Sequence, residues 1–265
     1  MYSPEDVAKN YVEIGVSKTK LPLGKMFVLA VLAGMFIGLA GAGASCAVVS
    51  IESASVGKFV GGCIFPAGLA MVLVAGSELF TGNCLIIISV LEKKASISGM
   101  LRNLAVVYLG NLVGGLIISA LIVYSGTYSL FSGYFAVSAV NTAVSKCTMS
   151  FTSALLKGVL CNFLVCIAVW MSFTAKDTAG RIIGLFFPIM LFVLCGFEHC
   201  VANMYYIPAG IMALSNPAYA LSKINTAGLT WTAFFIKNLI PVTLGNTIGG
   251  FAVGTAYWYA YLRNK

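Results

Sequence analysis

The sequence predicts an all-α membrane protein with six transmembrane helices in two inverted three-helix repeats, the second and fifth helices being broken. Three observations support this fold class. Of the 265 residues, 60% are hydrophobic and 9% are charged, and the mean hydropathy is +0.96, whereas a soluble domain carries about 25% charged residues. The apolar residues form six long runs, and one unusual polar motif occurs in both halves of the chain.

The six apolar runs are the predicted membrane crossings. A helix needs roughly 20 apolar residues to cross a hydrocarbon core of about 30 Å. The runs show no regular ten-residue alternation, so helices are favoured over an outer-membrane β-barrel. They lie at about 26–51, 59–91, 103–125, 148–175, 182–214 and 232–262.

Two segments outside these runs complete a single predicted channel domain, residues 1–265. Residues 1–25 are polar and mixed in charge, and we expect a short amphipathic cytoplasmic segment at the membrane surface. The stretch 126–147 is rich in Ser, Thr and Tyr and is expected to be an outer loop. The two repeats are then residues 26–125 and 148–262.

The second and fifth runs are too long for one simple crossing. Their 33 residues in a single helix would span about 50 Å, against a core of about 30 Å. Near its middle each run carries the frame G-x-E-x-x-x-x-N, as GSELFTGN at 76–83 and GFEHCVAN at 196–203. Irregular backbone at membrane depth is tolerated only where it is buried in protein or lines a cavity. We therefore predict that each run is a half-helix, a loop and a second half-helix.

The frame is part of a longer repeat. Nine positions of 102–115 agree in type with 237–250 at one constant offset. Each half holds three crossings, and an odd number of crossings inverts the second half relative to the first. Inverted repeats of this kind place their site near the midplane, where the halves meet.

The distribution of charge predicts the orientation of the chain. The net charge is +8, and the 16 Lys and Arg residues lie in short segments between the apolar runs. This pattern is a topology signal, so no nucleic-acid partner is expected. Eleven of these residues fall on the face that holds both termini and five on the other face. We therefore expect a multi-pass protein of the plasma (inner) membrane with both termini cytoplasmic.

The Gly, Glu and Asn of the frame occur in both copies, so their predicted task is to build the loops. Glycine permits the turn, and a glutamate can accept hydrogen bonds from loop N–H groups that lack helical partners. A role of the glutamates in transport is the alternative. The predicted scaffold residues are Gly76, Glu78, Asn83, Gly196 and Glu198.

The positions at which the copies differ are the candidate functional residues. Leu79 corresponds to His199, the only histidine, and Thr81 corresponds to Val201. An ionisable residue at membrane depth is costly and is a functional-site hypothesis by default. A packed histidine bonded to a backbone carbonyl is the alternative. One histidine with no cysteine cluster cannot supply a metal ligand set, and the eight cysteines are predicted to be small buried hydrophobes. We expect no metal and no cofactor.

These residues suit an anion pathway. Half-helix N-termini create a weak positive potential at the midplane. His199 adds a titratable donor, and Thr81, Asn162 and Asn203 supply neutral hydrogen bonds. Apolar side chains above and below are expected to form constrictions, with ordinary core packing as the alternative for each. They are Leu79, Phe80, Phe65, Leu69, Val165 and Phe192.

The two frames resemble the signatures of the formate/nitrite transporter family. The segment CNFLVCIAVWM at 161–171 is also similar to the fourth helix of that family. The resemblance covers almost the whole chain and is strongest to the clostridial hydrosulfide channels. It implies an aquaporin-like protomer with its own pore, in a homo-pentamer whose central hole is plugged by lipid.

The resemblance also implies roles for single residues. His199 matches the pore histidine and Thr81 the loop threonine, with Asn162 and Asn203 as polar neighbours. One slit matches Leu79 and Phe80, and the other matches Phe65, Leu69 and Phe192. A basic residue at the outer vestibule matches Lys146, and its inner counterpart matches Lys18 or Lys20. Such lysines attract anions, and ordinary snorkelling is the alternative.

Two rival interpretations carry less support. An aquaglyceroporin for small neutral solutes would need its Asn-Pro-Ala motif in both halves, but that motif occurs only at 216–218 and is predicted to be a turn. An enzyme would need a complete catalytic constellation, and none is present. We therefore predict a passive or proton-coupled pore in the lipid bilayer for small monovalent weak-acid anions. Hydrosulfide is the first choice, followed by formate and nitrite.

Overall fold

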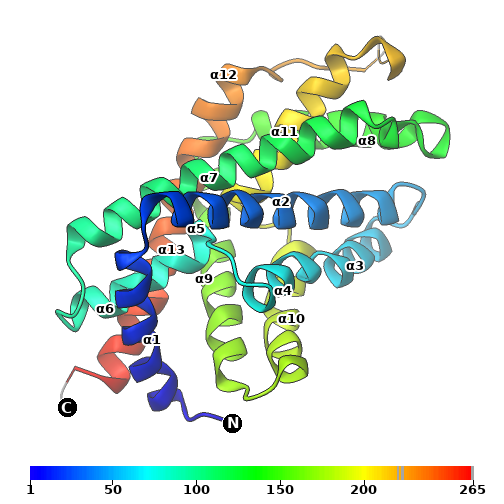
Figure 1. The fold of residues 1–265 in the computed structure, drawn as a ribbon. Coiled ribbons are helices and arrows are strands. Elements are labelled where there is room, and N and C mark those ends of the chain that lie inside the picture. Colours follow the sequence, from blue (N-terminus) through cyan, green and yellow to red (C-terminus); the bar gives the residue numbers. More distant parts are fainter. Residues whose placement is uncertain (220, 222–223, 264–265) are drawn as a thin grey trace.

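The computed structural model describes residues 1–219, 221 and 224–263, and all regular structure within them is helical (Figure 1). The first half holds α1 (Pro4–Lys20), α2 (Leu23–Val48), α3 (Ala54–Ile64), α4 (Pro66–Val74), α5 (Phe80–Asn83), the 3-10 turn η1 (Cys84–Ile86), α6 (Ile87–Leu91) and α7 (Ile97–Tyr124). The second half holds α8 (Tyr134–Cys147), α9 (Phe151–Thr174), α10 (Thr178–Leu194), α11 (Cys200–Ser215), α12 (Trp231–Ala233), the π-helical turn η5 (Phe234–Leu239) and α13 (Ile240–Tyr261).

Three short 3-10 turns connect these helices. They are η2 (Thr127–Ser129), η3 (Phe131–Gly133) and η4 (Pro217–Tyr219). The last of them holds the Asn-Pro-Ala motif. There the side chain of Asn216 accepts a hydrogen bond from the N–H of Ala218 at 3.1 Å, so the motif forms a turn, as predicted.

Both predicted helix breaks are present. In the second run the helical structure stops at Val74 and resumes at Phe80, and in the fifth run it stops at Leu194 and resumes at Cys200. Within the described residues, five helical segments are long and apolar enough to cross a membrane. Six crossings were predicted, and the fifth run is the one not among these five. Its break leaves two helices of 17 and 16 residues, each too short to be included.

Glycine permits the backbone turn at each break. Gly76 has φ +83° and Gly196 has φ +67°, a left-handed conformation that glycine adopts without the steric cost of a Cβ. A Cβ on Gly76 would meet nothing within 4 Å. Conformation, and not lack of space, therefore requires glycine at this position.

Close helix pairs surround the breaks. Helix α2 packs along α7, and α9 packs along α13. A Cβ built on Gly114 would lie 2.1 Å from the carbonyl oxygen of Val31, and one built on Gly249 would lie 2.2 Å from that of Val159. Glycine faces therefore pack closely, and the two halves use this packing at equivalent places.

Helix α1 contributes to the protein core, and its expected position at the membrane surface stays a prediction. It packs against α6 and η1 and buries Val7 and Tyr11. The Tyr11 hydroxyl donates to the carbonyl of Gly82 at 3.2 Å. The apolar side of this amphipathic helix is therefore covered by protein. At its start Ser3 exchanges hydrogen bonds with Asp6, and these bonds lower the pKa of the Asp6 carboxyl.

The predicted outer loop at 126–147 is corrected. Its second part is the helix α8, which packs against α11 and buries Phe135 and Val140. The Ser and Thr residues that suggested a loop alternate with apolar residues at helical spacing, and that apolar side faces the core.

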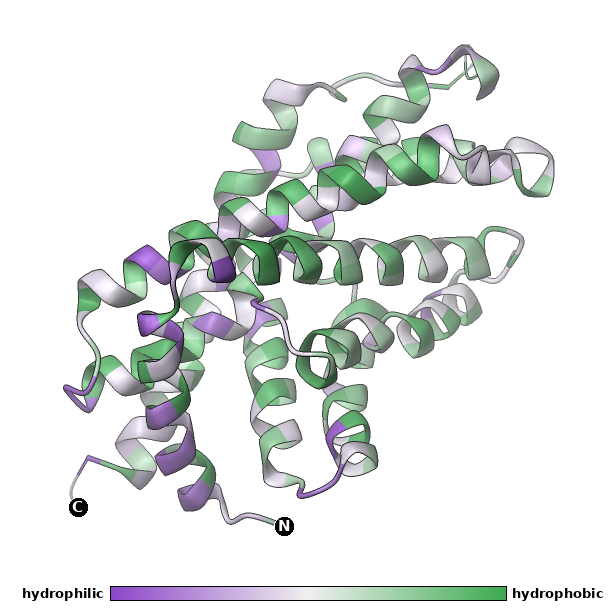
Figure 2. Ribbon diagram, in the orientation of Figure 1, coloured by the Kyte–Doolittle hydropathy of each residue, from purple (hydrophilic) through white to green (hydrophobic). Residues whose placement is uncertain are grey.

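The distribution of hydropathy agrees with a membrane protein. Hydrophobic residues dominate α2 and α7, whereas hydrophilic residues gather on α1 and in the turn between α9 and α10 (Figure 2). The chain begins and α13 ends at the same end of the molecule (Figure 1), where α1 packs against α13. Two of the charges counted above, Lys223 and Lys265, lie outside the described residues.

Candidate functional site

His199 joins the two broken loops. It lies directly before α11, where its Nδ1 accepts a hydrogen bond from the N–H of Ala202 at 3.0 Å. Its Nε2 lies 2.9 Å from Oγ1 of Thr81, which lies in α5, directly after the other break. Thr81 is fully buried and His199 is 4% exposed. The two differing positions that the sequence singled out therefore form one contact.

These hydrogen bonds determine the tautomer of the ring. A backbone N–H can only donate, so Nδ1 of His199 carries no proton while it accepts from Ala202. The ring is then neutral, with its proton on Nε2, and it donates to the hydroxyl oxygen of Thr81. The Thr81 hydroxyl keeps its own proton for another acceptor.

Both loops are held by the same asparagine device. Asn111 accepts from the N–H of Phe80 and donates to the carbonyl of Glu78, both at 2.9 Å. Asn246 makes the same two hydrogen bonds with loop 196–203, also at 2.9 Å. Sequence reasoning missed this role, although both asparagines were in the repeat that it detected.

Glu78 is bound by side chains, which corrects its predicted partners. Its carboxylate accepts from Nζ of Lys18 at 2.7 Å and from Nδ2 of Asn83 at 2.6 Å. The sequence had predicted loop N–H groups as the donors, but those of Glu78 and Phe80 bond elsewhere. Of the two candidate vestibule lysines, Lys18 reaches this loop, whereas Lys20 is exposed.

Glu198 has equivalent partners in the second loop. It accepts from Nζ of Lys146 at 2.8 Å and from Nδ2 of Asn203 at 2.7 Å. Asn203 also donates to Asn238 at 2.8 Å. Its own oxygen, Oδ1, is buried and has no hydrogen-bond partner among the described residues. The second loop therefore carries a buried acceptor whose hydrogen-bonding capacity is unused among the described residues.

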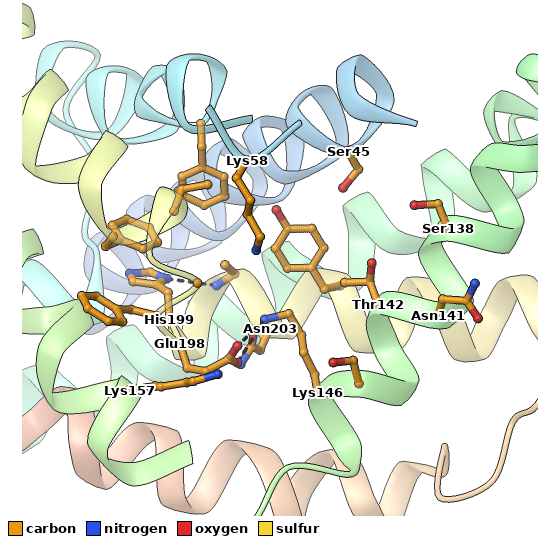
Figure 3. A pocket seen from close by; sticks show the side chains of 18 of the residues that line it. Ser45, Lys58, Ser138, Asn141, Thr142, Lys146, Lys157, Glu198, His199 and Asn203 are labelled. Atoms are coloured by element: carbon orange, nitrogen blue, oxygen red, sulfur yellow. Dashed lines mark hydrogen bonds and ion pairs between the residues drawn. The ribbon is translucent and has the colours of Figure 1, made fainter. Parts of the chain in front are cut away.

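A cavity of about 780 Å³ opens onto the second loop. Glu198, His199 and Asn203 line it, together with three lysines (Figure 3). Lys146 comes from α8, and the other two lysines are Lys58 of α3 and Lys157 of α9.

Two of the residues predicted to form a constriction lie beside the histidine. Phe65 and Phe192 also line the cavity, with their ring centroids 5.5 Å apart in an edge-to-face contact. The ring of Phe192 stacks on His199 at 6.0 Å. Leu69 and Val165 are buried but do not line the cavity.

The other predicted slit lies in the first loop. Leu79 and Phe80 are both buried there, and Phe80 makes an edge-to-face contact with Tyr108 at 5.0 Å. The sequence did not identify Tyr108 as a neighbour of the site, because aromatic residues are common in membrane helices.

Asn162 is a third polar residue that only one half supplies. It donates to the carbonyl of Thr81 at 3.2 Å and to that of Asn246 at 2.6 Å. Asn111 bonds the carbonyl of Ala30, and Asn246 bonds that of Gly158. Ala30 and Gly158 are therefore equivalent in the two halves, and so are the residues four positions later, Gly34 and Asn162. At each of three equivalent positions only one half has a polar side chain. These side chains, His199, Thr81 and Asn162, lie together around Thr81.

Comparison with known proteins agrees with this architecture. The family model described as formate/nitrite transporter matches residues 5–259. A probable formate transporter of Methanothermobacter thermautotrophicus is 39% identical, over 98% of this chain and 97% of the relative. The formate channel FocA of Escherichia coli (strain K12) is 38% identical, over 99% of this chain and 95% of the relative.

Two solved structures share the fold. A pentameric formate channel with formate bound superposes with a TM-score of 0.81 at 36% identity, covering 91% of this chain and 98% of that one. An ion channel of the FNT family superposes with a TM-score of 0.83 at 29% identity, covering 96% and 98%. The predicted family, the all-helical fold and the absence of an enzymatic role are thereby confirmed: this chain belongs to the formate/nitrite transporter family of membrane channels and transporters.

Proposed function

We propose that this chain forms a pore for small monovalent anions of weak acids, with its polar centre at His199 and Thr81. The observation that carries the proposal is the 2.9 Å contact between these residues at the end of a lysine-lined cavity. It joins the two broken loops through two positions at which one copy of the frame is polar and the other is apolar.

The lysines and the aromatic side chains set the conditions for entry. Lys146 and the cavity around it raise the local concentration of anions. Phe65 and Phe192 then restrict the passage beside His199, where an anion must lose part of its hydration. Because a bare charge is costly in apolar surroundings, the pore favours an anion that can be neutralised by a proton.

The polar centre suits both forms of a weak acid. The Thr81 hydroxyl has a free proton to donate to an anion, since the ring of His199 supplies its other bond. The free Oδ1 of Asn203 is an acceptor for the O–H or S–H of the neutral acid. The site can therefore hydrogen-bond a small weak acid in both forms, the anion through the Thr81 hydroxyl and the neutral acid through Oδ1 of Asn203.

Formate is the first substrate to test. Relatives at 38–39% identity are named as a formate channel and a formate transporter. Hydrosulfide was the first choice from the sequence, but none of the relatives reported above is named for it. Hydrosulfide and nitrite remain candidates, because both are small, monovalent and conjugate to a weak acid.

The pore belongs to a larger assembly. A solved relative is a pentamer, and we propose that five copies of this chain associate in the plasma membrane. The whole chain, residues 1–265, acts as one channel domain. Both termini face the cytoplasm, as the excess of positive charge on their side indicates.

Flux into proteoliposomes tests the function. We expect formate, hydrosulfide and nitrite to enter faster than glycerol. Thr81→Val keeps the shape, removes the hydroxyl and copies Val201 of the other loop, so formate flux should fall by about tenfold, the effect of one lost hydrogen bond. Thr81→Ser should retain most of the flux. Entry of glycerol without any anion would contradict the proposal.

A further inference from the structure

Two lysines of the cavity play no part in the ion pairs of the loops. Among the described residues, Lys146 pairs with Glu198, whereas Lys58 and Lys157 have no carboxylate within ion-pair distance. Both nevertheless extend into the cavity from two different helices (Figure 3). The Lys58 nitrogen lies 3.5 Å from the place that a Cβ would take on Gly196, so its charge sits against the loop.

The scaffold does not require a lysine at position 157. The carbonyl of Lys157 accepts a hydrogen bond from the N–H of Glu198 at 3.3 Å, and the carbonyl of Leu29 does the same for Glu78 at the same distance. Leu29 and Lys157 are therefore equivalent in the two halves. Since leucine serves the loop equally well, the ammonium group of Lys157 has a task on the cavity side.

The charge of the cavity is unbalanced. Among the described residues its lining contains three lysines and one glutamate, Glu198, which leaves an excess of two positive charges. The ring of His199 adds none while it caps α11. Neutral hydrogen-bond donors, Ser138 and Thr142 among them, line another wall (Figure 3). A monovalent anion leaves one positive charge uncompensated, whereas a divalent anion matches both.

We propose that Lys58 and Lys157 bind a divalent tetrahedral oxyanion, of the sulfate or hydrogen phosphate class, in this cavity. The site lies before the contact of Phe65 with Phe192, and a strongly hydrated divalent ion does not pass such an apolar restriction. The bound ion therefore occupies the mouth of the pore and competes with entry of monovalent anions from this side. The competition rests on the proposed function, but the binding does not.

Calorimetric titration with sulfate tests the site directly. The probes are sulfate and methanesulfonate, which has a similar shape and one charge fewer, added at constant ionic strength to the purified full-length chain. The test variant is Lys58→Gln/Lys157→Leu, whose leucine copies Leu29. The control Lys25→Gln/Lys94→Gln removes the same charge from exposed residues outside the cavity.

We expect saturable sulfate binding to wild type and control. Methanesulfonate should bind to wild type at least about tenfold more weakly than sulfate. Sulfate should bind to the test variant about tenfold more weakly than to wild type, because charge-assisted contacts are removed. Absence of sulfate binding to wild type, equal affinity for the two probes, or unchanged binding to the test variant would each overturn the site.

A second measurement separates the two proposals. Sulfate is added to proteoliposomes during formate entry, and each protein is compared with its own sulfate-free rate. Inhibition of wild type and control, but not of the test variant, supports competition at this site. Sulfate that binds without slowing formate overturns the competition. If sulfate binds but formate does not enter at all, the proposed function fails and the binding site stands.

Discussion

His199 uses its two ring nitrogens for different tasks. Nδ1 caps α11 through Ala202, and Nε2 reaches Thr81 in the other loop. Its counterpart Leu79 precedes α5 without any side-chain cap. His199 therefore has a structural role as the N-cap of α11, but this role uses only Nδ1. The remaining nitrogen faces the threonine that the other loop supplies.

Two substitutions separate these tasks. Asn is a good N-cap, so His199→Asn should keep the thermal stability of α11, whereas His199→Phe should lose about 1 kcal/mol of stability with the cap. Both remove the titratable ring. We expect formate flux to fall in both, and whatever pH dependence the ring contributes to transport to be lost in both. A pH profile unchanged from wild type would exclude His199 from transport.

At the scale of elements, glycines allow the helices to approach and asparagines hold the loops between them. Helices α2 and α7 approach so closely that a Cβ on Gly34 would lie 2.2 Å from the carbonyl oxygen of Asn111. Asn111 in turn ties residues 78 and 80. Helix packing and loop geometry are therefore coupled, because the same residue takes part in both.

Two glycines of α2 provide a matched test of this packing. Gly34→Ala should cost about 1–3 kcal/mol, since the methyl group displaces backbone. Gly43→Ala meets only Ile64, at 3.8 Å, and should be neutral or stabilise by up to about 1 kcal/mol through helix propensity. Thermal unfolding in detergent measures both. Equal unfolding midpoints for the two variants would show that the stability of the protein does not depend on the close approach of α2 and α7 at Gly34.

The ion pair between Lys146 and Glu198 connects α8 to the second loop. Its side chains are 15% and 6% exposed, so Glu198→Gln leaves a lysine without its partner and should cost about 3–5 kcal/mol. Lys146→Met combined with Glu198→Gln should recover part of this loss. A double-mutant cycle of unfolding midpoints gives the coupling, and a coupling near zero would contradict the role.

An exposed pair serves as the control for this cycle. Lys9 and Glu5 are 2.8 Å apart, with side chains 59% and 34% exposed. Lys9→Met should leave the unfolding midpoint unchanged, because water already solvates both charges.

At the scale of the whole molecule, the two halves share one scaffold and differ at their polar centre. Lys18, Glu78, Asn83 and Asn103 form one network of hydrogen bonds. Lys146, Glu198, Asn203 and Asn238 form the other, with the same bonds. Each network ties a helix, α1 or α8, to a loop. The helices that sequence analysis left outside the repeats are thus parts of the scaffold.

The distribution of charge predicts the orientation of the molecule in the membrane. Helices α1 and α13 meet at one end (Figure 1), so the N-terminus and the end of α13 share a side. We expect a green fluorescent protein fused after the last residue to fluoresce in bacteria and an alkaline phosphatase fused there to be inactive. The opposite pair of results would place the termini outside and contradict the positive-inside count.

Local chemistry allowed the sequence alone to determine the fold class and the two breaks, and the resemblance of the frames indicated the family. Hydropathy, glycine and a repeated frame are properties of residues near one another in the chain, and their energetic consequences hold wherever the chain goes. The helix at 134–147 was expected to be a loop, because its Ser and Thr residues hid an apolar side at helical spacing. The amphipathic character of residues 4–20 likewise did not show that protein covers their apolar side.

Only the tertiary structure decided which side chains meet. Thr81 and His199 are 118 positions apart, and the pairing of Glu78 with Lys18 and not Lys20 depends on the placement of α1. Contacts of this range arise from the packing of whole helices, which no local pattern specifies. The sequence by itself identified the residues in which the halves differ. The fold decided that His199, Thr81 and Asn162 meet at one point.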